Sequence, residues 1–147
     1  MRAQQLPTES ERTFALVFDK GDDPVTGLAA FARDERLTAA RFTGIGAFSE
    51  LVVGYFDRER KDYARIAIDE QVEVLSLTGD VAVDEREEPQ VHAHVVVGKA
   101  DGSAHGGHLL EARVWPTLEI VLVQSPAALR KRVDAETGLA LITAAGG

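Results

Sequence analysis

The four histidines of this chain all lie within seventeen residues, as His92, His94, His105 and His108. Imidazole is the most common protein ligand for zinc-like metals, and it is also the side chain that changes charge near neutral pH. His92 and His94 are separated by a single residue, so on a β-strand both rings would lie on the same face. A loop that returns another histidine to this face would complete a site with three nitrogen ligands.

Two histidines are candidates for the third ligand. Gly106 and Gly107 precede His108 and give the backbone freedom to bring that ring beside the first pair. His105 is offset from His108 by three residues and is the second candidate. Three nitrogen ligands leave one position of a tetrahedral metal open for water, as in catalytic zinc sites. In the alternative interpretation the rings are hydrogen-bonded core or interface histidines, and a bound ion could also be purely structural.

Two acidic residues, Glu73 and Glu119, are each flanked by apolar neighbours. A carboxylate buried in a sheet is costly unless it is paired or ligates a metal. Each could orient a histidine, act as a general base on a metal-bound water, or pair with Arg65 or Arg113. Each could equally be a solvent-facing strand residue. We keep Glu73 and Glu119 as the catalytic candidates.

The composition is that of a globular domain, with 147 residues, 45% of them apolar and 27% charged. The formal net charge of −8 disfavours DNA as a partner unless a local basic patch exists. The absence of cysteine excludes disulfides and thiolate metal sites. Neither a membrane span nor a secretory signal is expected from the apolar pattern. The cysteine-free composition fits a reducing cytoplasm, so we expect a cytoplasmic protein.

Hydrophobic periodicity predicts one principal helix and a series of short strands. Asp23 suits the helix N-cap and Pro24 the first turn, with the helix running to about Arg36. Turns are expected at Gly79-Asp80 and a strand break at Trp115-Pro116, and Pro126–Arg132 could form a short helix. The fold class is therefore α/β of the α+β type, a mainly antiparallel sheet with one helix packed on it. The predicted strands and apolar segments are Arg12–Phe18, Thr38–Thr43, Leu51–Phe56, Tyr63–Ile68, Val72–Thr78, Val81–Val83, Val91–Val97, Leu109–Val114, Leu118–Val123 and Leu139–Ile142.

An ordered set of short motifs resembles the plant-and-prokaryote-conserved domain, PPC. The match covers residues 12–142, which we take as a single domain between an N-terminal extension (1–11) and a C-terminal tail (143–147). The motifs that carry the resemblance are Gly44-Ile45-Gly46-Ala47, Gly54-Tyr55-Phe56-Asp57, Tyr63, the run from Glu73 to Gly79, His92-Ala93-His94, Asp101-Gly102, Gly106-Gly107-His108-Leu109 and Pro116-Thr117-Leu118-Glu119.

The resemblance implies a homotrimer and a divalent metal, most simply zinc, at His92, His94 and His108. His105 matches no position of the family pattern. In plants the domain lies behind an AT-hook, the DNA-contacting segment of nuclear DNA-binding proteins. This sequence has no Arg-Gly-Arg-Pro motif of an AT-hook, so the resemblance does not extend to that DNA contact. The plant proteins recruit partners through a Gly-Arg-Phe-Glu-Ile-Leu motif. The corresponding segment here, from Glu70 to Leu75, lacks its arginine and its aromatic residue, so the resemblance does not extend to this interaction.

Four functions therefore remain as hypotheses, of which the last is an oligomeric interaction module that forms a stable trimer with neither metal nor turnover. The first is a stand-alone, trimeric, metal-binding PPC protein with no assigned cellular role. The second is a DNA-associated regulator, and the third is a metal-dependent hydrolase or lyase of unknown substrate.

Overall fold

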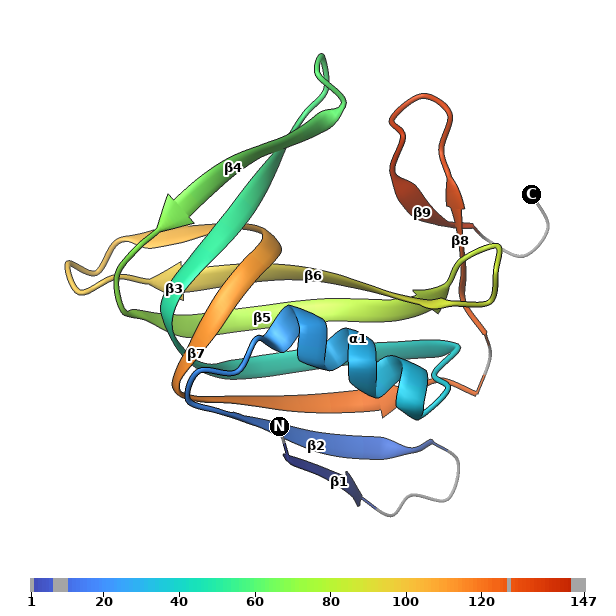
Figure 1. Ribbon diagram of the computed structural model, residues 1–147, viewed down its shortest axis with the longest axis horizontal. Coiled ribbons are helices and arrows are strands. Elements are labelled where there is room, and N and C mark those ends of the chain that lie inside the picture. The colour runs from blue at the N-terminus through green and yellow to red at the C-terminus, as the bar shows by residue number, and fades with distance from the viewer. Residues whose placement is uncertain (1, 7–10, 127, 144–147) are drawn as a thin grey trace.

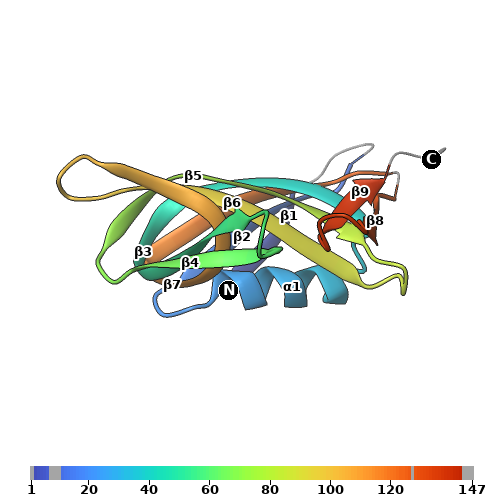
Figure 2. The same cartoon turned by 90° about the horizontal axis from the view of Figure 1, so that it is seen from above.

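The computed structural model describes residues 2–6, 11–126 and 128–143. In these residues the chain forms a strongly curved β-sheet with one helix against one face, as Figures 1 and 2 show. The predicted α+β class and the mainly antiparallel sheet are confirmed, since every strand pair but one is antiparallel. The elements in chain order are β1 (Arg2–Leu6), β2 (Thr13–Asp19), α1 (Pro24–Asp34), β3 (Ala39–Asp57), β4 (Asp62–Ile68), β5 (Val72–Val83), β6 (Pro89–Gly98), β7 (Ala104–Gln124), β8 (Arg130–Val133) and β9 (Ala140–Thr143).

The helix begins where the sequence predicts. A side-chain oxygen of Asp23 accepts hydrogen bonds from the backbone nitrogens of Val25 (2.9 Å) and Thr26 (3.2 Å), and Pro24 occupies the first turn. The helix ends at Asp34, slightly before the predicted end. Arg36 adopts a positive φ of 53° just beyond it, which terminates the helical backbone.

Two long strands, β3 and β7, run side by side and carry the curvature of the sheet. The strand break predicted at Trp115-Pro116 is wrong, because β7 continues through these residues. The separate strands predicted over Thr38–Thr43 and Leu51–Phe56 are parts of one continuous strand, β3. The pairing instead shifts register near Gly46. A Cβ at Gly46 would lie 2.3 Å from the carbonyl oxygen of Thr117, so glycine allows the two strands to come this close.

The predicted turn at Gly79-Asp80 is also wrong, because both residues lie inside β5. Gly79 is needed here for space. A Cβ on it would lie 2.2 Å from the ring of Phe42 and 2.3 Å from the carbonyl oxygen of His92. The strand therefore continues, and Asp80 is paired in register with His92 of β6.

The sheet closes on itself through four strands. β3 pairs with β5, β5 with β6, β6 with β7, and β7 again with β3. The β6–β7 hairpin places His94 directly opposite His108. The curved inner face and α1 together bury the core, in which Phe18, Phe42 and Phe48 are the largest fully buried side chains.

The ends of the described chain differ from the predicted ones. Residues 2–6 of the predicted N-terminal extension form β1, which pairs with β2. The helix predicted over Pro126–Arg132 is wrong, since β8 begins at Arg130 and forms a hairpin with β9. The backbone of Leu129 is hydrogen-bonded to distant residues instead of within a helix. Its nitrogen donates to the carbonyl oxygen of Thr38, and its carbonyl oxygen accepts from the nitrogen of Val83. Of the predicted tail, Thr143 ends β9 and residues 144–147 lie outside the described residues.

Within the described ranges, no helix has both the length and the apolar character that a membrane span requires.

Candidate metal centre

Three histidines meet where β6 and β7 pair. One ring nitrogen of each of His92, His94 and His108 lies within 4.8 Å of the corresponding nitrogens of the other two. His92 and His94 alternate along β6 with the buried residues Ala93 and Val95, so both rings leave the same face of the strand. The alternation expected from the sequence therefore brings the predicted ligand residues together.

The rings pack closely. The Nε2 atoms of His92 and His94 are 3.2 Å apart. The ring of His108 stacks on that of His92, with centroids 5.2 Å apart and planes at 29°. It also stacks on Tyr63 of β4, with centroids 4.6 Å apart and planes at 22°. The aromatic ring of Tyr63 thus limits the orientations open to His108.

A carboxylate fixes the orientation of His92. The Oδ2 atom of Asp80 lies 3.3 Å from Nδ1 of His92, and its Oδ1 atom lies 2.7 Å from Nζ of Lys131. Burial opposes ionisation of Asp80, but the hydrogen bonds with His92 and Lys131 outweigh it and lower the pKa of the carboxyl group. An ionised carboxylate can only accept, so Nδ1 of His92 donates its proton to Asp80, and Nε2 is the nitrogen that faces the cluster.

Asp80 and Lys131 are not among the site residues predicted from the sequence. Asp80 belongs to a Gly-Asp dipeptide, which is a turn signal, and Lys131 lies in a basic run that is typical of a solvated surface. The side chain of Lys131 is only 4% exposed in the structure. Asp80 could have been predicted if β5 had been expected to continue through Gly79. Its side chain would then lie on the same face as Thr78, which pairs with His94.

The remaining histidines of the cluster are held in the neutral form. Burial, and then the charges of His92, His94 and Lys131, lower the pKa of His108 to about 4. Burial and the neighbouring His92 also lower the pKa of His94. Both rings are therefore neutral at pH 7, and a neutral imidazole has the lone pair that a metal requires.

The depressed pKa of His108 predicts how the stability of the metal-free protein depends on pH. In the unfolded chain this ring takes up a proton near pH 6.5, whereas in the folded chain it resists protonation down to about pH 4. The unfolded state therefore binds more protons in this window, and the free energy of unfolding should fall as the pH falls from about 6.5 to about 4. Urea unfolding of chelator-treated protein across this range would measure the slope. His108→Gln should flatten it, and an unchanged slope would contradict the assignment to His108.

The cluster opens into a pocket of about 650 Å³. His92, His94 and His108 lie on one side, and the walls come from the β3–β4 hairpin and from β9. In Figure 1 the β3–β4 hairpin and the β8–β9 hairpin both rise above β6, the first toward the left of the view and the second toward the right. The wall residues are mostly apolar and include Tyr55, Phe56, Tyr63, Leu139 and Leu141.

The other candidates from the sequence lie elsewhere. His105 is exposed, with its Nε2 3.4 Å from the hydroxyl of Ser103, and it is not part of the cluster. Glu73 and Glu119 are exposed on β5 and β7 and line a different pocket of about 600 Å³ together with Ile45. The structure therefore brings these two acids near each other but not to the histidines, and their role as catalytic candidates stays a prediction.

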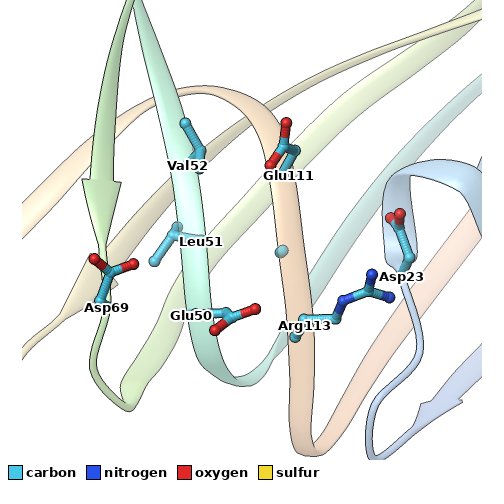
Figure 3. Close-up of a pocket in the computed structure, with 8 residues that line it drawn as sticks. Asp23, Glu50, Leu51, Val52, Asp69, Glu111 and Arg113 are labelled. Atoms are coloured by element: carbon cyan, nitrogen blue, oxygen red, sulfur yellow. The ribbon is translucent and has the colours of Figure 1, made fainter.

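A second, smaller hollow of about 310 Å³ is lined largely by acids. Figure 3 shows Glu50, Asp69 and Glu111 around it, with Arg113 pointing toward Asp23. In the part of the chain that the structure describes, only the histidine cluster brings three ligand-type side chains within metal-holding distance. The acidic hollow is therefore not a second candidate for a metal.

The chain is similar to solved structures over nearly its whole length. A candidate DNA-binding protein from Ralstonia eutropha JMP134 is 31% identical, with a TM-score of 0.86 and coverage of 97% of this chain and 95% of that one. A plant- and prokaryote-conserved (PPC) protein from Pyrococcus horikoshii is 30% identical, with a TM-score of 0.84 and coverage of 97% and 95%. A protein from Archaeoglobus fulgidus that is described as metal-containing is 34% identical, with a TM-score of 0.80 and coverage of 98% and 99%.

The chain also matches curated relatives that are much longer. A bifunctional protein GlmU from Synechococcus sp. (strain JA-3-3Ab) is 34% identical over 126 residues, or 84% of this chain, but the chain spans only 19% of its length. The family model of the Plants and Prokaryotes Conserved (PCC) domain matches residues 5–126. These findings confirm the resemblance that the sequence motifs carried, and the chain belongs to the Plants and Prokaryotes Conserved domain family.

Proposed function

We propose that this protein binds one divalent metal ion per chain through His92, His94 and His108, and that zinc is the ion. The observation that carries the proposal is the convergence of three imidazole nitrogens within 4.8 Å of one another. Zinc accepts imidazole nitrogen at about 2.0–2.1 Å in tetrahedral sites. The metal-containing relative from Archaeoglobus fulgidus supports the same conclusion.

The chemistry of the donor set fits a cation. Desolvation is the main cause of the lowered pKa of His94 and of His108, and Asp80 directs Nε2 of His92 into the cluster. The Nδ1 atom of His108 is buried and has no hydrogen-bond partner among the described residues. A buried polar atom without a partner is costly. A metal ion bound at the cluster would give the ring of His108 an interaction that the described residues do not supply.

A zinc ion with three nitrogen ligands would supply an open coordination position and a water of lowered pKa. The residues of this chain would hold that position at the base of the pocket between the β3–β4 hairpin and β9. The apolar walls would limit the water that reaches it. A hydrolase or lyase activity would use this arrangement, but its substrate is unassigned, and so is the cellular role. The cytoplasmic location expected from the cysteine-free sequence also stays a prediction.

We also propose that the protein is a homotrimer. Apolar side chains on the central strands are exposed on one face of the sheet: Ile45 is 62% exposed, Leu75 56% and Val121 48%. They line a hollow of about 500 Å³ on this face. Exposed apolar surface of this kind commonly marks a protein interface. His94 is exposed and lies opposite Thr78 of β5, which is also exposed. If this face forms the trimer interface, each metal centre would lie near a subunit boundary.

DNA binding is the second candidate function. The observation in its favour is the structural similarity to the candidate DNA-binding protein from Ralstonia eutropha. The net charge of −8 weighs against it, because an acidic protein repels the phosphate backbone unless basic residues gather locally.

Metal content and mass, measured together, test the main proposal. Protein purified without a histidine tag should contain about one zinc per chain by elemental analysis, in particles of trimer mass by light scattering. His94→Ala should lose the metal while keeping the mass, since His94 is exposed and supports no core packing. His105→Ala is the matched control and should keep both. A wild-type protein free of metal even after incubation with zinc would refute the metal proposal and turn attention to DNA.

A further inference from the structure

We propose that Asp80 is a positioning residue of the metal centre and that Lys131 holds it in place. The inference rests on the proposed metal function and goes beyond it, because neither residue is a ligand. It assigns a role to an ion pair between β5 and β8, in which Lys131 is buried and Asp80 is half-buried, that the three histidines alone leave unexplained.

The contacts of Asp80 divide its two oxygens between two partners. Oδ2 lies 3.3 Å from Nδ1 of His92, and Oδ1 lies 2.7 Å from Nζ of Lys131. A carboxylate fixed at both oxygens cannot rotate without losing one of these interactions. The ring of His92 therefore meets an acceptor of fixed position on the side away from His94.

The fixed acceptor determines which nitrogen of His92 can bind a metal. A neutral imidazole has one protonated and one unprotonated nitrogen, and the protonated nitrogen must face the carboxylate. Nε2 is then left unprotonated and lies 3.2 Å from Nε2 of His94, inside the cluster. Without Asp80 the ring would be free to adopt the other tautomer, in which Nε2 carries a proton and cannot ligate. Carboxylate partners of this kind commonly raise metal affinity tenfold to hundredfold.

Lys131 anchors the carboxylate of Asp80. Its side chain is 4% exposed, and it approaches Asp80 from β8, a strand that pairs with β5 in register only at Val83 and Arg130. The ammonium and the carboxylate cancel in charge, so the pair orients His92 without adding net charge beside the metal. Replacing a buried ion pair by apolar residues of similar volume is often neutral for stability. The contribution of this pair to stability therefore does not explain its presence, whereas its effect on the orientation of His92 does.

The decisive variant removes both charges together. Asp80→Asn alone leaves the buried ammonium of Lys131 unpaired, which can destabilise the fold and adds a positive charge near the metal. The double variant Asp80→Leu/Lys131→Met has the same local net charge as the wild type but has no acceptor for Nδ1 of His92. Any loss of metal affinity in it reports on orientation rather than on charge. Glu85→Gln is the control, because it removes an exposed carboxylate from the neighbouring β5–β6 connection.

Two measurements on the whole chain test the inference. Zinc affinity is measured by competition with a chromophoric chelator, and the tautomer of His92 by NMR of metal-free protein with ¹⁵N-labelled histidine. The double variant should bind zinc about 10- to 100-fold more weakly than the wild type. Its His92 should populate both tautomers, whereas the wild type and Glu85→Gln should show the Nδ1-protonated form alone.

The outcomes separate this inference from the proposed function. If the wild type binds zinc and the double variant binds it equally well with an unchanged His92 tautomer, Asp80 is not a positioning residue and the metal function stands. If the wild type binds no zinc, the proposed function fails and this inference fails with it. A purely structural ion pair would change the unfolding free energy of the double variant but leave the tautomer as it is.

Discussion

Zinc at a hundredfold excess over its dissociation constant should raise the free energy of unfolding by about 2.7 kcal/mol, because the ion binds the folded chain and not the unfolded one. For a domain of about this size the melting temperature should rise by roughly 5–10 °C. The stabilisation should grow with zinc concentration, as mass action requires. Scanning calorimetry of chelator-treated protein, with zinc added back in steps, would measure it.

Two histidine variants make this result specific. His94→Ala removes one of the three converging nitrogens and should abolish most of the shift, whereas His105→Ala removes an exposed ring outside the cluster and should leave it intact. Equal shifts in both variants would mean that zinc stabilises the protein at another place. No shift in the wild type would contradict the metal proposal itself.

Gly79→Ala should lower the free energy of unfolding by about 3 kcal/mol, near the upper end for overpacking a well-packed site. The added methyl would lie 2.2 Å from the buried ring of Phe42 and 2.3 Å from the carbonyl oxygen of His92. A ring packed in the core and a backbone oxygen in a strand pair cannot both move aside cheaply. Urea unfolding of wild type and variant, compared at constant pH, would give the difference.

Gly98→Ala is the matched control at the end of β6. Its added methyl would lie 3.3 Å from the end of the Leu75 side chain, which is exposed and free to move. Its effect should stay below about 1 kcal/mol, close to the ordinary cost or benefit of such a change. If Gly79→Ala proved equally mild, the close contact of β5 with Phe42 and β6 would not be as tight as described.

The histidine cluster could be predicted from the sequence because its geometry depends on local rules. Side chains alternate along a strand, so His92 and His94 had to share a face, and the hairpin that follows returns His108 opposite His94. The helix start at Asp23 was equally local, since a capping side chain bonds to the amides that follow it. Both predictions needed information from only a few neighbouring residues.

The residues around the cluster could not be found in this way. Gly79-Asp80 has the composition of a turn, and only the ring of Phe42, from a distant strand, explains why a glycine lies inside β5. Lys131 lies in a basic run that is typical of a solvated surface, and the sequence does not show that Leu129 pairs with Thr38 and Val83. Glycine and charge runs are ambiguous signals, and long-range packing decides between their interpretations.

The residues of the metal centre lie at different positions along the chain, and these positions determine the order in which its parts can form. His92, His94 and His108 belong to one hairpin of neighbouring strands, so their contacts have a short sequence separation and need little loop closure. Asp80 can join through the adjacent β5, whereas Lys131 is supplied by β8, near the end of the chain. During synthesis the three imidazoles therefore leave the ribosome before the lysine that holds their carboxylate. An ion captured at that stage would bind the hairpin loosely and be fixed in place when the C-terminal strands dock, so metal loading and the last step of folding would share one kinetic phase.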